Sequence, residues 1–425
     1  METLALISLL ITAVFLLLGV EILVCLGGGA ILMTLMTGAF PVENVGFTAF
    51  SSINIFPLLA MPLYILTGDL VSAGGISHMF VVLAKSLVGW VRGGLAVTTM
   101  VAAEGFAAIS GSNSATVAAM GRIMVPELKA DGYPEDFAAG TIACCGTIGI
   151  ITPPSIVFIL YGVTAGTSIG DLFIGGVIPG LILVAGMSTA ALTVCWSQGH
   201  GSTFPFNLKT ALKAAWKAKL AFGAIAIILG GIYGGLFTPT EAAGIAVAYC
   251  LLAGLFVTRE IKVKQLPDIM AQSSGVNGMI APIIAMAMIF SELLAVTGLP
   301  QAGVNFLLSF SGNPTSVMGL VLVILLIAGC VMEATPNILL LTPLLVPVAN
   351  SLGYHPVHFG VIMVVTLAIG FVTPPLGLNL FVASSVTGVP FTRIAVKAVP
   401  YIMALVTGLM IIWQFPLLTL MFLDH

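Results

Sequence analysis

Long apolar runs, separated by short polar or glycine- and proline-rich breaks, dominate the chain. Hydrophobic residues make up 59% of its 425 residues and charged residues only 7%, whereas soluble domains carry about 25% charged residues. A water-facing surface cannot be built from this composition. At about 20 residues a span, the runs allow more than ten crossings. The pattern therefore predicts an all-α polytopic membrane protein, whose helices satisfy their own backbone in lipid.

The first apolar run, residues 4–26, lacks a basic leader and a small-residue cleavage site. We therefore expect it to be one retained membrane helix and not a signal peptide. The six cysteines are scattered within apolar runs and show no metal-ligand spacing. This pattern favours small buried side chains over a metal site.

An internal repeat shows in the positions of three short motifs. Each motif recurs 221 residues later: Thr-Pro-Pro at 152–154 and 373–375, Val-Pro at 125–126 and 346–347, and Gly-Tyr at 132–133 and 353–354. Prolines remove backbone donors and free the carbonyls of the preceding turn, and lipid cannot satisfy those carbonyls. The two Thr-Pro-Pro segments therefore predict two broken helices, which in paired repeats point to the binding site of a secondary transporter.

A polar tip precedes each Thr-Pro-Pro break by about 40 residues, at 112–114 and at 335–337. Two half-helices that meet at such a tip form a re-entrant hairpin, whose exposed backbone is tolerated only in a cavity. Helix N-termini at the tips suit an anion, and carbonyl and hydroxyl oxygens suit a hard cation such as sodium. The alternative is that these small polar residues only allow helices to pack closely.

Seven of the 13 Lys and Arg residues form two patches, within 209–219 and within 259–264, separated by two apolar runs. The positive-inside rule favours placing both patches on the cytoplasmic side. The domains predicted from this layout are an N-terminal scaffold helix with its connection (1–44), a first repeat (45–195), basic surface helices with a central helical pair (196–275), and a second repeat (276–425). The sequence leaves open whether the repeats are inverted or parallel, because re-entrant segments make the crossings hard to count.

Four segments of the chain, 110–133, 146–162, 168–180 and 373–388, resemble the large membrane subunit of tripartite ATP-independent periplasmic (TRAP) transporters. The resemblance spans nearly the whole chain. It implies an elevator-type fold in the bacterial inner membrane that imports a small organic acid with sodium. Sialic acid is the favoured solute and a C4-dicarboxylate the next.

The resemblance also implies cofactors and partners. Sodium would be the only metal ion bound, and no transition metal would be present. Nucleic acid would not be a partner. A soluble periplasmic binding protein would deliver the carboxylate solute. A four-helix small membrane subunit would be a separate chain, because no such block is recognisable here.

The resemblance places one sodium site between the first tip and the first break, and another between the second tip and the second break. The sodium-binding candidates are Ser112, Asn113, Ser114, Gly149, Thr152, Pro153, Thr335, Pro336, Asn337, Gly370, Thr373 and Pro374. The substrate-binding candidates are Ser112, Asn113, Arg122 and Asn379. Arg122 could instead extend to the membrane interface, and Asn379 could instead join two helices.

Acidic residues within apolar runs are functional candidates, because a charge in the membrane is costly. Glu104 and Glu333 could serve an ion or a structural hydrogen bond, and Asp69 and Glu292 could brace corresponding helices of the two repeats. An intramembrane enzyme is one alternative, but the Gly111–Ser114 turn has no histidine in a neighbouring segment. A passive channel or scaffold is the other, although it would not need paired broken helices in one chain.

Overall fold

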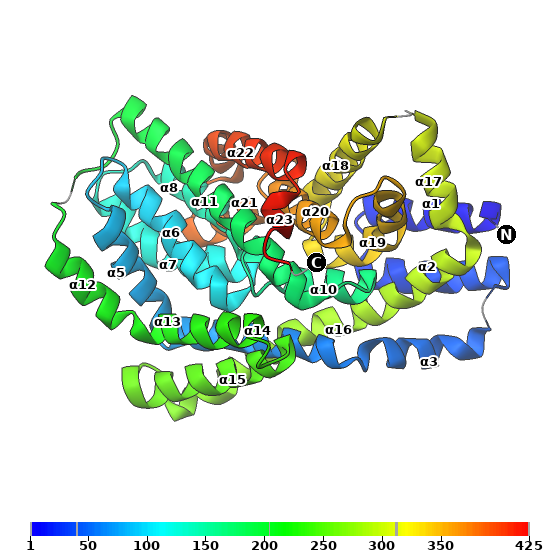
Figure 1. The fold of residues 1–425 in the computed structure, drawn as a ribbon, viewed down its shortest axis with the longest axis horizontal. Helices are drawn as coiled ribbons and strands as arrows, with labels where there is room; N and C mark the ends of the chain where they lie inside the picture. The colour runs from blue at the N-terminus through cyan, green and yellow to red at the C-terminus, as the bar shows by residue number, and fades with distance from the viewer. Residues whose placement is uncertain (1, 40, 204, 311–312, 424–425) are drawn as a thin grey trace.

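The computed structural model describes every residue except 1, 40, 204, 311–312, 424 and 425. The regular secondary structure of the described residues is helical throughout (Figure 1). The first part contains α1 (Glu2–Leu17), α2 (Ile22–Thr37), α3 (Val42–Ile53), η1 (Phe56–Leu59), α4 (Ala60–Ala73), α5 (Ile76–Val88), α6 (Gly94–Ser110), α7 (Asn113–Ala130), α8 (Glu135–Cys145), α9 (Ile148–Ile151), α10 (Ile156–Ala165) and α11 (Ile169–Gln198).

The central part contains α12 (Leu208–Lys217), α13 (Lys219–Ile225), η2 (Ala226–Gly230), α14 (Gly231–Tyr233), α15 (Pro239–Leu252), η3 (Ala253–Thr258) and η4 (Val263–Gln265). The last part contains α16 (Leu266–Thr297), α17 (Leu299–Phe310), α18 (Pro314–Val331), α19 (Ala334–Ser351), α20 (Pro356–Gly370), α21 (Leu378–Thr387), α22 (Phe391–Gln414) and α23 (Leu417–Leu420).

The N-terminal run forms two helices, so the prediction of one helix over 4–26 was wrong. Gly19 has a φ of +80° and turns the chain between α1 and α2, which then pack against each other. Most residues avoid this backbone conformation, whereas glycine adopts it readily. Glu21 is the exposed residue that precedes α2. Hydropathy did not reveal the turn, because the residues around Gly19 are themselves apolar.

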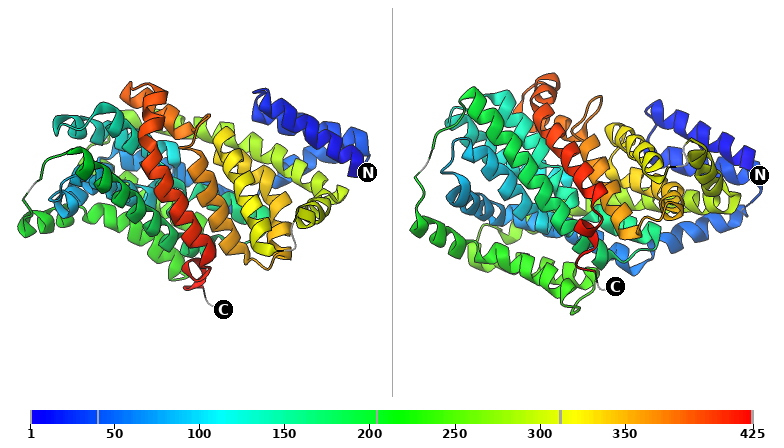
Figure 2. Two further views of the ribbon diagram at one scale, coloured as in Figure 1. Left: turned by 90° about the horizontal axis from the view of Figure 1, so that it is seen from above. Right: turned by 45° about the horizontal axis from the view of Figure 1, so that its top comes forward.

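The predicted repeat recurs in the helices. Helices α7 and α19 begin and end 221 residues apart, and so do the starts of α8 and α20. The hairpin α6–α7 lies in the half of the molecule that also contains α5 and α12, whereas the hairpin α18–α19 lies in the half that contains α1 and α2 (Figures 1 and 2). The hairpins thus enter from opposite ends and their tips meet near the middle, so the two repeats are inverted.

Each helix that follows a break packs against the hairpin of the other repeat. Helix α10, after the first break, contacts α19, and α21, after the second break, contacts α7 and α8. This exchange joins the two repeats through their breaks. It also brings residues more than 200 positions apart in the sequence to the same tip.

Six of the described helices are long and apolar enough to cross a membrane, and eight if two bent pairs count as single spans. This is fewer than the sequence suggested. The N-terminal pair and several helices of the hairpins and breaks are apolar but only 10–17 residues long, which is shorter than a full crossing. Re-entrant hairpins therefore account for much of the apolar sequence.

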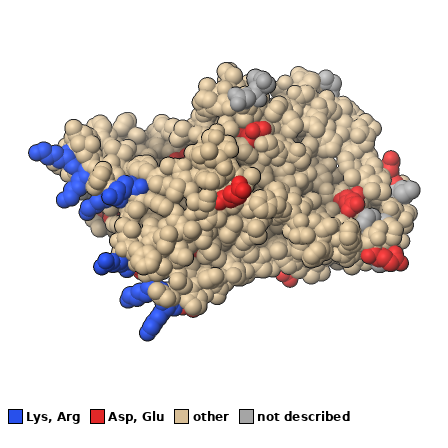
Figure 3. All heavy atoms as spheres, turned by 60° about the horizontal axis from the view of Figure 1, so that its bottom comes forward, with Lys and Arg blue, Asp and Glu red and all other residues tan. Residues whose placement is uncertain are grey.

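Basic side chains gather at one end of the molecule, the end at which α5 and α12 lie (Figures 1 and 3). Acidic side chains on the same view lie elsewhere, including at the opposite end (Figure 3). The two basic patches recognised in the sequence fall on this same end. Their position agrees with the prediction that two apolar segments return the chain to its starting side.

Candidate functional site

A cavity of about 350 Å³ lies where the two hairpin tips meet helices α4 and α16. Residues of α6–α7 and α18–α19 form one side, and residues of α4 and α16 form the other, which we call the α4–α16 wall. The polar and charged lining residues are Asp69, Ser72, Ser110, Ser112, Asn113, Ser114, Arg122, Gln272, Glu333 and Thr335. The structure thus brings both predicted tips to one central cavity.

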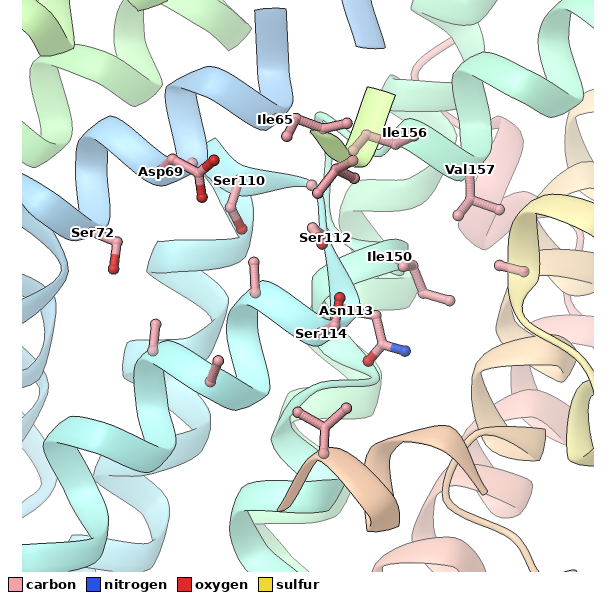
Figure 4. Close-up of a pocket in the computed structure, with 18 of the residues that line it drawn as sticks. Ile65, Asp69, Ser72, Ser110, Ser112, Asn113, Ser114, Ile150, Ile156 and Val157 are labelled. Atoms are coloured by element: carbon pink, nitrogen blue, oxygen red, sulfur yellow. The ribbon is translucent and has the colours of Figure 1, made fainter. Parts of the chain in front are cut away.

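The first tip is a two-residue turn between α6 and α7 (Figure 4). Gly111 has a φ of +58°, and a Cβ atom there would lie 2.3 Å from the carbonyl oxygen of Pro154. Only glycine fits both the conformation and the space. The N–H of Ile156 in turn donates to the carbonyl of Gly111 at 3.4 Å. The first tip therefore contacts the first break directly, as predicted.

Gly149, just before the first break, lies under this tip. A Cβ at Gly149 would lie 2.4 Å from the carbonyl oxygen of Ser112 and 2.7 Å from Oγ1 of Thr116. Thr116 also donates from Oγ1 to the Ser112 carbonyl at 2.7 Å. Backbone and hydroxyl oxygens of the tip thus converge on Gly149.

Two asparagine side chains from different repeats meet beside this tip. A Cβ at Gly146 would lie 2.9 Å from Oδ1 of Asn113 and 2.9 Å from Nδ2 of Asn379. Asn113 is 7% exposed and Asn379 is fully buried. Neither Oδ1 of Asn113 nor either side-chain amide atom of Asn379 has a hydrogen-bond partner among the described residues. Buried amides without partners are costly, so these atoms are suited to an additional ligand.

Asn379 lies behind the cavity and does not line it. The prediction that Asn379 contacts the substrate therefore lacks support from its position. Its neighbours Asn113 and Gly146 instead place it among the oxygens expected for an ion. Sequence spacing could not show this, because Asn379 belongs to the second repeat and reaches the tip of the first.

The second tip begins earlier than its polar motif. Helix α18 ends at Val331, the turn is Met332–Glu333, and α19 already starts at Ala334. The 221-residue offset therefore pairs Ser112 with Glu333 and Ser114 with Thr335. The sequence analysis placed the second tip at 335–337, whereas the turn lies at Met332–Glu333, because the Thr-Pro-Asn sequence belongs to the first turn of α19.

Within this first turn of α19, Thr335 lines the cavity and Asn337 is fully buried. Nδ2 of Asn337 donates to the carbonyls of Ala328 and Met332 at 3.1 and 3.0 Å. Its Oδ1 has no partner among the described residues. The Asn337 side chain thus satisfies two carbonyls at the end of α18, and its Oδ1 remains as one buried acceptor for a ligand.

The second break differs from the first. Thr152, Pro153 and Pro154 are all buried, whereas Pro374 and Pro375 are exposed. Gly370 packs against the backbone of α18, since a Cβ there would lie 2.4 Å from the carbonyl carbon of Gly329. Thr373 donates from Oγ1 to the carbonyl of Ile369 at 2.7 Å. The combination of Thr335, Pro336 and Asn337 with the backbone around Gly370, Thr373 and Pro374 stays a prediction.

At the first break, the hydroxyl of Thr152 points away from the tip. Its Oγ1 donates to Oε2 of Glu104 at 2.7 Å, close to Gly180, where a Cβ would lie 3.2 Å from the Thr152 hydroxyl. The hydroxyl proton of Thr152 is therefore used by Glu104. Glu104 lies on α6, so this hydrogen bond connects the first break to α6. A structural hydrogen bond was one of the two roles considered for Glu104 from the sequence.

Three charged side chains line the cavity. Arg122 lies on α7, Glu333 lies at the second tip, and Asp69 on α4 accepts a hydrogen bond from Ser273 of α16 at 2.5 Å. Arg122 forms no ion pair with a described residue. Asp69 lies beside Ser110 in the close-up (Figure 4), where α4 approaches the first tip so closely that a Cβ at Gly68 would lie 3.1 Å from the Ser110 Cβ.

No group of three or more His, Cys, Asp or Glu residues in the described part of the chain could hold a transition metal. The donors at the tips are backbone, hydroxyl and amide oxygens. Oxygens of this kind suit hard cations. The arrangement combines a polar, anion-compatible cavity with oxygen donors of the hairpin tips in its lining.

The family model described as "Tripartite ATP-independent periplasmic transporter, DctM component" matches residues 9–418. The chain belongs to this family. It is accordingly a multi-pass protein of the bacterial inner membrane and a transporter subunit, not an enzyme.

Relatives of the permease are named for different solutes. It is 40% identical to the isethionate TRAP transporter permease protein DctMQ of Oleidesulfovibrio alaskensis, over 96% of this chain and 65% of that relative. It is 38% identical to the C4-dicarboxylate large permease DctM of Pseudomonas aeruginosa, over 93% of this chain and 92% of the relative. It is 33% identical to the sialic acid large permease SiaM of Vibrio cholerae, over 92% of each.

The permease also shares its fold with a solved transporter. The Alcanivorax borkumensis YdaH transporter, whose crystal structure was described as revealing an unusual topology, superposes with a TM-score of 0.61 at 16% identity. The match covers 88% of this chain and 87% of that one. At this identity the likeness concerns the fold alone.

Sequence reasoning missed several residues at the site of the permease. Ser110 and Gln272 line the cavity, Thr116 and Gly146 contact residues of the first tip, and Ser273 contacts the lining residue Asp69. Thr116 could have been found, because it lies four residues after Ser112 on the same helical face. Gln272 and Ser273 carry no such signal, since they belong to the distant helix α16.

Proposed function

We propose that this chain is the membrane permease of a sodium-driven importer of small organic anions. The observation that carries the proposal concerns two buried amide oxygens without a partner among the described residues. One belongs to Asn113, which lines the cavity formed by both hairpin tips, and the other belongs to Asn337 in the first turn of α19. Oxygens in such positions suit a sodium ion at each tip. The solute would occupy the cavity in front of them.

At the first tip, sodium would be held by Asn113, Asn379 and the backbone around Ser112 and Gly149. These groups converge within a few ångströms in the contacts described above. At the second tip, Asn337 and Thr335 would provide oxygens. Completing this second site requires the second break to approach the tip, because its Thr-Pro-Pro segment now lies partly exposed.

The solute would be an anion. The first turns of α7 and α19 both line the cavity, and helix N-termini favour negative charge. Arg122 can bind a planar anionic group through two N–H donors. Relatives named for isethionate, C4-dicarboxylate and sialic acid share a carboxylate or sulfonate. We propose this class of solute, with isethionate, a C4-dicarboxylate and sialic acid as the three probes.

The charges of the cavity give a reason for coupling to a cation. Arg122 carries one positive charge, whereas Asp69 and Glu333 carry two negative charges when ionised. An anionic solute alone would therefore enter a cavity that is already negative. Bound sodium offsets this charge, and in a partly desolvated cavity such compensation is large.

The proposed transport step is an elevator movement. The hairpins and broken helices would slide against the α4–α16 wall, because the cavity lies along the boundary between these two parts. The partners proposed are a small membrane subunit, which would support the wall, and a periplasmic binding protein, which would release the solute. Membership of a tripartite family supports both.

The test is solute uptake into proteoliposomes that contain the permease and its small subunit. Isethionate, succinate and sialic acid are offered as labelled probes with the binding protein encoded beside the permease. We expect uptake of at least one probe, only with an inward sodium gradient and with the binding protein present. Equal uptake when potassium replaces sodium would refute the coupling, and uptake without the binding protein would refute the partnership.

A further inference from the structure

Helix α12 lies at the basic end of the molecule, outside the cavity and its tips (Figures 1 and 3). Asn207 starts the helix by accepting from the N–H groups of Lys209 and Thr210 at 2.9 and 3.2 Å. The helix then runs to Lys217 and is bent by 54° from the following segment 219–233. A bend of this size lets α12 run along a membrane surface while the next helix enters the bilayer.

The side of α12 that faces the protein consists of small residues. Ala211 and Ala214, together with Ala218 just after the helix, are at most 5% exposed, and Ala214 and Ala218 pack with Leu83 and Met79 of α5. Alanine brings the two helices close together. This contact fixes the rotation of α12 about its axis, so the positions of its other faces follow from the helical period.

The second face is apolar although it is exposed. Leu208, Leu212 and Trp216 recur every four residues and are 62%, 62% and 71% exposed. Phe206, just before the helix, continues this face and is 54% exposed. Such a stripe of large apolar residues on a surface helix marks a membrane or protein contact, and tryptophan is enriched at the membrane–water interface.

The third face is basic. Lys209, Lys213 and Lys217 follow the apolar residues by one position each, and all three are exposed. None of them forms an ion pair with a described residue. Lys219 lies 4.7 Å from the centre of the Trp216 ring, so a fourth positive charge adjoins the apolar stripe.

We propose that α12 is a binding site for the headgroups of anionic phospholipids in the leaflet at the basic end. Its apolar stripe would insert among the acyl chains while the adjacent lysines contact the lipid phosphates. Interfacial helices have this combination of an inserted apolar face and a basic polar face. An acidic soluble protein would explain the lysines but not an exposed Leu-Leu-Trp stripe beside them.

The second basic patch extends the same surface. Lys262 and Lys264 are exposed, as are Phe256 and Val263 nearby in the sequence. Each lysine near an anionic membrane contributes about 1 kcal/mol, which is about a fivefold change in lipid preference. The three lysines of α12 together are therefore expected to select anionic over zwitterionic lipid strongly.

The experiment uses fluorescence quenching by brominated lipids in proteoliposomes that contain the full permease with its small subunit. Brominated phosphatidylglycerol is compared with brominated phosphatidylcholine, and the signal of Trp216 is obtained as the difference between wild type and Trp216→Phe. We expect the Trp216 signal to be quenched by both lipids, with at least fivefold greater effectiveness of phosphatidylglycerol when each brominated lipid is a minor component.

Two triple variants identify the cause. Lys209→Gln/Lys213→Gln/Lys217→Gln should lose most of the preference for phosphatidylglycerol, and the remainder would come from Lys219, Lys262 and Lys264. The control Lys129→Gln/Arg393→Gln/Lys397→Gln removes the same charge elsewhere and should keep the preference. Equal quenching by both lipids in the wild type, no quenching of Trp216, or an undiminished preference in the α12 variant would each overturn the proposal. Monodisperse elution of every variant confirms that a changed signal does not come from unfolding.

Discussion

At the scale of single residues, the site depends on small residues and on asparagine. Gly111, Gly146 and Gly149 let the first tip approach the first break to distances that any side chain would block. Asn113, Asn337 and Asn379 are buried with amide atoms that lack partners. The glycines account for the close approach of the tip to the break, and the unpartnered amides support the proposed ion site.

The unpartnered amides lead to a prediction about sodium. Asn113→Ala and Asn379→Ala should each raise the sodium concentration that gives half-maximal uptake by about tenfold, which corresponds to about 1.4 kcal/mol of ion binding. The reason is the loss of one oxygen donor at the first tip. Uptake against sodium concentration is measured in proteoliposomes at matched protein density.

Asn350→Ala is the matched control, because Asn350 is exposed near the end of α19. It should leave half-saturation unchanged. Wild-type sodium dependence in both Asn113→Ala and Asn379→Ala would remove these amides from the ion site.

Gly149→Ala tests the close contact of the tip. The new Cβ would lie 2.4 Å from the Ser112 carbonyl, so the tip must move, and such overpacking costs about 1–3 kcal/mol. We expect lower thermal stability and at least tenfold slower uptake. Gly186→Ala is the control, because its nearest contact would be an ordinary 3.6 Å to Ala404. A Gly149→Ala protein as stable and as active as Gly186→Ala would contradict the packing described here.

At the scale of elements, local motifs predicted more than hydropathy did. Proline pairs and polar tips marked both breaks and both hairpins, because each motif acts on its own backbone. Hydropathy missed the turn at Gly19, whose immediate neighbours are apolar, and it did not separate helices long enough to cross a membrane from shorter apolar helices. The register of the second tip was misplaced because Glu333, not the Thr-Pro-Asn motif, occupies the turn.

Contacts between elements could not be predicted. Asn379 reaches the tip of the other repeat, and Ser273 reaches Asp69 from a helix 204 residues away. No local periodicity encodes these pairings. The first follows from the exchange in which each helix after a break packs against the opposite hairpin, and the second from the packing of α16 against α4.

The two breaks differ in how they are closed, and Ser155 is the reason at the first. Its Oγ accepts from the N–H of Phe158 at 3.3 Å and donates to the carbonyl of Ile150 at 2.5 Å, so it joins both halves of the broken helix. Ser155→Ala should therefore destabilise the protein by about 2 kcal/mol, more than the loss of a cap alone, which costs about 1 kcal/mol.

Ser168→Ala is the matched control, since Ser168 caps α11 through the N–H of Asp171 at an exposed position. Thermal unfolding of the two purified variants gives the comparison. We expect the decrease in unfolding temperature to be about twice as large for Ser155→Ala. An equal or smaller decrease would show that the bond to Ile150 contributes nothing.

At the scale of the whole molecule, inverted repeats and charge distribution together define an orientation. The hairpins enter from opposite ends, and basic side chains gather at the end of the first hairpin (Figures 1 and 3). The positive-inside rule makes this end cytoplasmic. The first hairpin then opens toward the cytoplasm and the second toward the periplasm.

Cysteine labelling tests this orientation. Lys213→Cys and Lys262→Cys lie at exposed positions of the basic end, and Glu43→Cys lies at an exposed position in the first turn of α3, at the opposite end. The six native cysteines are buried, so impermeant maleimide should report mainly the introduced thiols. In intact cells we expect labelling of Glu43→Cys alone. In inverted membrane vesicles we expect labelling of Lys213→Cys and Lys262→Cys, because the basic end then faces the reagent. Labelling of either lysine position from outside intact cells would reverse the orientation. Labelling of the two positions from different sides would show that the two apolar segments between them do not return the chain to its starting side.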